Sequence, residues 1–241
     1  MAHVRKKSLS LFSLVVFALF LCAGSSHAQT VKSQIQSMSG WQHCAACAGA
    51  GGSGPSASVT MAQHISSPSM TGNSSRHTIA SSRAYADALW WKQLGAVNSA
   101  KNLVYDLYFY IKTPQYSQAL EFDANQANGN HRWVFGTQCN IGAGHWDIWA
   151  NGAGKWTSTG IPCHAPAAYK WHHLTWEFKR SGTTGVTFVS FTYDGVKHYI
   201  NRTYPAKLSG SQELNVAFQM DMRSNHVSYS TWLDKVSLKY W

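Results

Sequence analysis

The chain has 241 residues, of which only 12% are charged, and a formal net charge of +10 at pH 7. Its lysines and arginines are scattered rather than gathered into the patch or stripe of a nucleic-acid-binding protein, so we expect no nucleic-acid partner. Hydrophobic residues make up 44% of the chain, which is enough for one large core.

The first 28 residues have the pattern of a secretory signal peptide. Arg5, Lys6 and Lys7 form a basic start, residues 9–23 form an apolar run, and Ser26-His27-Ala28 is a cleavage site of the small-x-Ala type. The apolar run is shorter than the roughly 20 residues of a membrane-spanning helix. We therefore expect a mature protein that starts at Gln29, is secreted or periplasmic, and has no membrane segment.

Residues 29–56 are polar and then glycine-rich, which predicts a loosely packed N-terminal arm. Four cysteines follow the signal peptide, and an even number in an oxidising compartment predicts disulfides. Of the three connectivities that four cysteines allow, we favour Cys139–Cys163, which joins two strand ends, and a local Cys44–Cys47 bridge. Cys44-Ala-Ala-Cys47 could also be a redox motif or half of a zinc site. A redox motif belongs at the N-terminus of a helix, and a zinc site needs a second pair of ligands, so we prefer the structural disulfide.

From about Ala57 onward, short strand-like runs recur between turn residues, and no stretch shows a helical apolar period. The expected strands are residues 76–80, 88–94, 103–111, 119–126, 132–139, 145–149, 171–179, 186–193, 196–202, 214–222 and 231–240. Asp194-Gly195 is typical of a type I′ hairpin turn. About a dozen strands at this spacing predict one all-β domain, residues 57–241, folded as a sandwich or barrel.

The strand from Gln118 to Gln126 carries the most informative pattern. Because successive residues of a strand point to opposite faces, Glu121, Asp123 and Asn125 share one face. A retaining glycoside hydrolase needs two carboxyl groups, one as nucleophile and one as general acid/base. Here the third polar position is an amide, Asn125 in a regular strand or Gln126 if a bulge intervenes, and neither can deliver a proton.

Several segments resemble the concanavalin A-like lectin/glucanase superfamily, most closely the laminarinase and lichenase type of glycoside hydrolase (family 16). In chain order they are residues 121–126, over the family's Glu-x-Asp-x-(x)-Glu signature, residues 171–178 with the Asp194-Gly195 hairpin, and residues 213–221 and 232–240, over the last two strands. The resemblance covers residues 119–241. It implies a two-sheet antiparallel jelly-roll sandwich whose concave face holds a sugar chain.

Position by position, the resemblance makes Glu121 the nucleophile and Asp123 the assisting residue, while the acid/base glutamate falls on Asn125 or Gln126. This departure argues against hydrolysis, because general acid–base catalysis contributes roughly 10²–10⁴-fold. Glu213 is the alternative acid/base, provided that it lies within roughly 5–6 Å of Glu121. A structural calcium ion is common in the superfamily, but the sequence has no recognisable ligand loop, and we expect no cofactor and no metal site.

Eleven tryptophans supply rings that can stack on sugars or fill a core. The candidates for ligand contact are Trp90, Trp91, Trp133, Trp146, Trp149 and Trp156. Trp90 and Trp91 are adjacent in a strand, so at most one faces the core and the other faces a groove or solvent. Trp149 shares a face with Asp147, which makes it more groove-like, whereas Trp146 lies on the other face and is more core-like.

Three functions are compatible with these features. The first is a secreted, non-catalytic carbohydrate-binding protein that holds a neutral glycan or polysaccharide on the concave face. Its ligand contacts would be Glu121, Asp123, Asn125, Gln126, Asn215, Gln219, Asp221 and Trp149, or one of Trp90 and Trp91. The second is a retaining glycoside hydrolase that uses Glu121 and Glu213. The third is a structural or adhesive surface protein that needs no small ligand.

Overall fold

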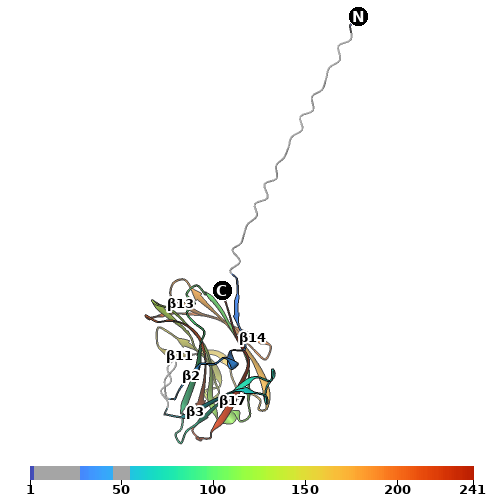
Figure 1. Ribbon diagram of the computed structural model, residues 1–241. Helices are drawn as coiled ribbons and strands as arrows, with labels where there is room; N and C mark the ends of the chain where they lie inside the picture. The colour runs from blue at the N-terminus through green and yellow to red at the C-terminus, as the bar shows by residue number, and fades with distance from the viewer. Residues whose placement is uncertain (3–27, 46–54) are drawn as a thin grey trace.

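The computed structural model describes residues 1–2, 28–45 and 55–241, so most of the predicted signal peptide lies outside it. Within these ranges the chain forms two antiparallel sheets packed face to face, with two short 3-10 helices, η1 (Ile35–Ser37) and η2 (Pro114–Tyr116) (Figure 1). This confirms the predicted all-β jelly-roll sandwich. No helix in the described part is long and apolar enough to span a bilayer.

One sheet has eight strands and the other has nine. In spatial order the eight-stranded sheet contains β14 (Val196–Pro205), β13 (Gly185–Tyr193), β12 (Lys170–Ser181), β6 (Asn102–Ile111), β17 (Tyr229–Tyr240), β4 (Ser74–Ala80) and β3 (Ser58–Ile65), with β1 (Thr30–Lys32) paired to β17. The nine-stranded sheet contains β11 (Lys155–Pro162), β10 (His145–Ala150), β9 (Thr137–Asn140), β7 (Ser117–Asn128), β16 (Gln212–Met222), β5 (Asp87–Gln93) and β2 (Trp41–Ala45), with β8 (His131–Phe135) paired to β7 and to β15 (Lys207–Leu208).

The core fills the space between the sheets because the strands alternate between apolar and polar residues. In β6 every second residue from Leu103 onward is buried, and the residues between them are half-buried. Aromatic side chains from the two sheets meet in the middle. Phe109 of β6 packs against Phe122 of β7 with ring centroids 5.2 Å apart, and Phe178 of β12 packs against Phe135 of β8 at 4.9 Å.

Residues 30–45 belong to the sandwich, in contrast to the loosely packed arm predicted for residues 29–56. β1 pairs with β17, and β2 pairs with β5. The glycine-rich residues 46–54 lie outside the described part of the chain. Both strands are short and lack alternation, so their partners far along the chain could not be found from local sequence.

Other strands also differ from the prediction. β3 and β11 were not expected, because their polar residues give a weak pattern. The run predicted as one strand, residues 132–139, is divided into β8 and β9 at Gly136.

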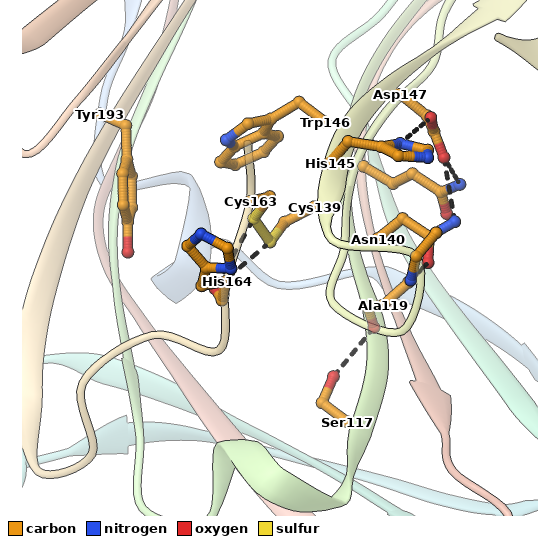
Figure 2. The surroundings of a disulfide bond; sticks show 12 residues. Ser117, Ala119, Cys139, Asn140, His145, Trp146, Asp147, Cys163, His164 and Tyr193 are labelled. Atoms are coloured by element: carbon orange, nitrogen blue, oxygen red, sulfur yellow. Dashed lines mark hydrogen bonds and ion pairs between the residues drawn. A yellow bond between two sulfur atoms is a disulfide. The ribbon is translucent and has the colours of Figure 1, made fainter. Parts of the chain in front are cut away.

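The predicted Cys139–Cys163 disulfide is present. Cys139 lies in β9 and Cys163 directly follows β11, and both are buried, so the bond ties two strand ends together (Figure 2). Cys44 is disulfide-bonded as well. Cys47 lies outside the described residues, so the Cys44–Cys47 pairing stays a prediction.

Replacing both Cys139 and Cys163 by alanine is expected to lower the free energy of unfolding by about 2–3 kcal/mol. The bond joins residues 24 positions apart, and its removal gives the unfolded chain more conformational freedom. Urea denaturation of the double variant measures the loss. Unchanged stability would mean that packing of the two strand ends alone fixes this loop.

Candidate functional site

Polar side chains cover the outer face of the nine-stranded sheet, the face that points away from the core. Glu121 of β7 lies opposite Gln219 of β16, and Asn125 lies opposite Asn215. Paired residues of neighbouring strands share a face, so these side chains form one polar row. The register thus places Glu121, Asp123 and Asn125 on one face, as the sequence predicts.

Gln126 lies on the opposite face of β7, because the pairing of β7 with β16 has no bulge beyond Ala119. Its Nε2 donates hydrogen bonds to the backbone carbonyls of Val97 and Ala100, and the residue is fully buried. Gln126 therefore anchors a loop at the end of the sandwich, in contrast to its predicted role as a ligand contact. Asn125 occupies the position that the resemblance assigns to the acid/base.

A single amide connects two carboxyl groups of the polar row. Gln219 Nε2 donates to Glu121 Oε1 at 2.6 Å and to Asp221 Oδ1 at 3.0 Å. Glu121 Oε2 and Gln219 Oε1 are buried and have no hydrogen-bond partner among the described residues. Because a buried polar atom without a partner is costly, these two oxygens are suited to accept hydrogen bonds from a ligand.

A cavity of about 330 Å³ lies over Glu121 and Asp221. Two aromatic side chains line it: Tyr85, which is 56% exposed, and Trp156 of β11, which is half-buried. The other lining residues are Asp87, Gln118, Ala119, Gln138, Asn140, Gln219 and Met222. The cavity thus combines carboxyl groups and amides with aromatic rings.

Burial raises the pKa of the carboxyl groups at this site. The pKa of Glu121 is raised well above its ordinary value by burial and by the charges of Asp221, Asp123 and Asp87. Burial also raises the pKa of Asp123 and of Asp221 to about 7, against hydrogen bonds that lower each of them. A share of these carboxyl groups therefore carries a proton near neutral pH and can donate as well as accept hydrogen bonds.

Asp147 of β10 fixes the amides on one side of the cavity. Its Oδ2 accepts a hydrogen bond from Gln138 Nε2 at 2.8 Å. It also accepts one from Asn140 Nδ2 at 3.0 Å, and His145 Nδ1 lies 2.8 Å from Oδ1 (Figure 2). Because each amide is held through its nitrogen, Gln138 and Asn140 have a fixed orientation beside Glu121.

Hydrogen bonds link the residues at the other end of the polar row to one another, although Asn125 Oδ1 is buried without a partner among the described residues. Asn125 Nδ2 donates to Asn215 Oδ1 at 2.9 Å, and Asn215 Nδ2 donates to Glu213 Oε2 at 3.1 Å. Glu213 Oε1 forms an ion pair with Arg132 at 2.9 Å. Asn125 and Asn215 are therefore partners of each other and do not line the cavity.

The pair of Glu121 and Glu213 predicted for a hydrolase is too far apart. Glu213 lies six residues along β16 from Gln219, the residue opposite Glu121, which corresponds to about 20 Å. Retaining chemistry needs a separation of roughly 5–5.5 Å. A second carboxyl group for Glu121 must therefore come from another residue.

Trp90 belongs to the core, in contrast to its predicted alternative role as a ligand contact. It is fully buried, and its ring lies 5.0 Å from the ring of His77 and 6.2 Å from that of Phe218. Burial lowers the pKa of His77 to about 3, which keeps this histidine neutral inside the core. Trp91 is half-buried on the outer face, opposite Ala217.

Trp149 lies on the outer face as predicted, but it is covered. It is only 6% exposed, and the ring of Trp156 packs edge-on against it at 5.3 Å. Trp156 lines the cavity in its place. Trp146 is a core residue, as predicted, and its ring lies 4.9 Å from that of Phe191.

Sequence reasoning missed several residues of the cavity. Gln138 and Asn140 alternate in β9 and so share the face of Glu121, which their spacing could have indicated. Asp87 begins β5 and lies opposite Asp221, so it shares that face as well. Tyr85 lies in a turn with a positive φ of 58°, where no periodic pattern exists to identify it.

Three or more His, Cys, Asp or Glu side chains do not gather into a metal-binding group anywhere in the described residues. The expected absence of a metal and of a cofactor stays a prediction.

No protein-family model matches the sequence, and no curated protein matches it. Solved structures of similar fold include a β-sandwich carbohydrate-binding module (8% identity, TM-score 0.45, covering 84% of this chain). A carbohydrate esterase from the Shiga toxin-encoding bacteriophage phi24B has 16% identity and a TM-score of 0.47, over 88% of this chain and 99% of the esterase. The lectin UEA-II complexed with galactose has 10% identity and a TM-score of 0.44, over 76% of this chain and 92% of the lectin.

This chain spans 58% of the carbohydrate-binding module's length. All three TM-scores lie below 0.5, so the function must be inferred from this chain's own residues. The resemblance to family 16 glycoside hydrolases stays a prediction as well. The chain has the β-sandwich fold of a jelly-roll protein.

Proposed function

We propose that this protein binds a neutral glycan in the cavity over Glu121 and Asp221, as a secreted or periplasmic carbohydrate-binding protein. The observation that carries the proposal is the pair of buried oxygens without partners, Glu121 Oε2 and Gln219 Oε1, in a cavity lined by Tyr85 and Trp156. Sugar hydroxyls supply donors for such oxygens, and the C–H faces of a sugar ring pack on aromatic rings.

The charge of the cavity supports a neutral ligand. Asp87, Glu121 and Asp221 line it, whereas none of the lysines and arginines in the described part of the chain does. An anionic sugar would be repelled by any carboxylate that is ionised here, and its own charge would lose water without gaining a partner. A neutral hexose or pentose polymer avoids both costs.

Tyr85→Ala is expected to weaken binding of a neutral β-glucan, xylan or mannan by about tenfold or more, because it removes an exposed ring from the cavity wall. Affinity electrophoresis in gels that contain each polymer measures the change. Tyr199→Ala is the matched control, since Tyr199 is 69% exposed on β14 of the other sheet.

Equal retardation of wild type and Tyr85→Ala by a polymer that binds would place the glycan elsewhere on the molecule. Absence of retardation by every neutral polymer would favour the structural or adhesive surface protein.

A retaining glycoside hydrolase is the second candidate, because Asp221 supplies the carboxyl group that Glu213 cannot. The hydrogen bonds of Gln219 Nε2 to Glu121 and Asp221 keep their bonded oxygens close to the separation of roughly 5–5.5 Å that retaining enzymes use. Ionised Asp221 would attack the anomeric carbon, while Glu121, whose pKa is raised well above its ordinary value, gives its proton to the leaving oxygen. Glu121 would then take a proton from the water that releases the sugar from Asp221.

Reducing-sugar assays on the same polymers separate the two candidates. Hydrolysis predicts that Asp221→Asn abolishes sugar release. Glu121→Gln should reduce it by roughly 10²–10⁴-fold on polymers, but by much less on an aryl glycoside whose leaving group needs no proton. Retardation without sugar release from any polymer supports the binding protein alone.

A further inference from the structure

A second cavity, of about 690 Å³, lies at the opposite end of the strands from Glu121. Its lining residues come from the turn between β7 and β8, the end of β12 and the segment before β6, and they are Lys101, Asn128, Asn130, His131, Lys179, Arg180, Gly182 and Thr183. Asn128 lies seven residues beyond Glu121 on β7, which corresponds to about 23 Å. The two cavities are therefore separate sites.

The lining of this cavity is basic. Lys101, Lys179 and Arg180 contribute three positive charges, and none of the lining residues that the structure describes has a carboxyl group. Two acids lie near along the strands, and both are already engaged: Glu213 by Arg132 at 2.9 Å, and Glu177, two residues before Lys179 in β12, by Lys197 at 2.6 Å. Three cations without a carboxylate among them form a site whose charge a ligand can neutralise.

The base of the cavity is held rigidly by Arg180. Its guanidinium carbon lies 3.7 Å from the ring centroid of Trp133, and its NH1 donates to the carbonyls of Asn98 and Ala100 at 2.9 and 3.1 Å. Gln126 donates to two carbonyls of the same loop. Arg180 Nε is buried and has no hydrogen-bond partner among the described residues. The guanidinium of Arg180 is thus placed before any ligand arrives, which reduces the entropy cost of binding.

We propose that this basic cavity binds the anionic groups of an acidic polysaccharide, either uronate carboxylates or sulfate esters. Both groups are flat or compact anions that accept charge-assisted hydrogen bonds from arginine and lysine. The amides and hydroxyl of Asn128, Asn130 and Thr183 line the same cavity and suit the neighbouring sugar hydroxyls.

The form of the site favours a polysaccharide over a nucleic acid. A nucleic-acid groove follows the backbone with an extended basic stripe and offers free aromatic faces for bases. Here the cations are confined to one cavity, and the nearby ring of Trp133 is fully buried and covered by Arg180.

The test is binding of polygalacturonate and of dextran sulfate at about 0.15 M salt, with unmodified dextran as the neutral control. Lys101→Ala/Lys179→Ala is expected to weaken binding of one or both anionic polymers by about tenfold or more, since two charge-assisted contacts are lost. The matched variant Lys112→Ala/Lys170→Ala removes the same charge from exposed residues at the other end of β6 and β12 and should change binding by less than about twofold. All four lysines are exposed, so equal melting temperatures serve as the folding control.

Each outcome decides the proposal. Loss of polygalacturonate binding identifies a uronate, and loss of dextran sulfate binding identifies a sulfate ester. Equal weakening in both double variants would mean general attraction to a basic protein and would overturn the site. Binding of neither polymer would also overturn the proposal. So would a single-stranded oligonucleotide that binds more tightly than the polymers and no longer binds to Lys101→Ala/Lys179→Ala. Tyr85→Ala should leave the anionic polymers bound, so this result is independent of the neutral-glycan site.

Discussion

Replacing Asp234 by alanine is expected to lower the free energy of unfolding by about 3–5 kcal/mol, because it removes a fully buried carboxylate that accepts hydrogen bonds from one loop and from buried Gln36. Asp234 of β17 is fully buried. Its Oδ2 accepts hydrogen bonds from Ser69 Oγ at 2.6 Å and from the backbone nitrogens of Met70 and Thr71 at 2.7 and 3.1 Å. Its Oδ1 accepts from Thr71 Oγ1 at 2.7 Å and from Gln36 Nε2 at 3.4 Å.

These contacts make Asp234 the point where three distant parts of the chain meet. They join η1, the loop between β3 and β4, and the last strand. Urea denaturation measures the loss. Asp106→Ala is the control, since the side chain of Asp106 is 33% exposed on the neighbouring strand and pairs with His173. A loss for Asp234→Ala no larger than that of the control would mean that the loop is held by packing alone.

The contribution of Asp234 depends on pH. Burial alone would raise its pKa, but the hydrogen bonds from Ser69, Thr71 and Met70 outweigh burial and hold the pKa below 3.8. A lowered pKa in the folded state means that the stabilisation is complete above the unfolded-state pKa of about 4 and is lost as pH falls through the folded-state value. Asp234→Ala should therefore differ less from wild type at pH 2 than at pH 7.

The carboxyl groups at Glu121, Asp123 and Asp221 should affect stability in the opposite direction. Their pKa values in the folded protein are raised by burial, to about 7 for Asp123 and Asp221. Groups with a raised folded-state pKa stabilise the fold most below about pH 4, and this contribution is lost as pH rises toward 7. The two aspartates alone should lower the free energy of unfolding by about 3–5 kcal/mol between pH 5 and pH 8.

Asp221→Asn should remove about half of this pH dependence and raise stability at pH 8, because one buried charge is no longer formed. Denaturation at pH 5 and pH 8 of wild type and variant measures both effects. Glu177→Gln is a suitable control, since the side chain of Glu177 is 36% exposed on β12 of the other sheet and pairs with Lys197 at 2.6 Å. Parallel curves for wild type and Asp221→Asn would show that Asp221 stays ionised in the fold.

The fold could be predicted because alternation is a local property. The runs in β6, β7 and β16 each show which side of a strand faces the core, and the turn at Asp194-Gly195 marks a hairpin. The same alternation placed Glu121, Asp123 and Asn125 on one face. These inferences need no knowledge of which strands are neighbours.

The predictions that were wrong depend on pairing between distant strands. The position of Glu213 relative to Glu121 follows from the register of β7 and β16, which separates them by about 20 Å. The role of Gln126 depends on the carbonyls of a loop 26 to 29 residues away. Tyr85 enters the cavity from a turn, where side-chain direction has no period. Such features are set by tertiary structure and leave no local pattern.

The place of β17 in its sheet has a consequence for how the chain acquires its structure. β17 ends at Tyr240, one residue before the last, yet it lies inside the eight-stranded sheet, between β6 and β4, and also pairs with β1. The two halves of this sheet cannot join until β17 lies between them. The sheet therefore depends on contacts between distant parts of the chain, which is typical of slow folding and leaves the edges of β4 and β6 unpaired until β17 binds there.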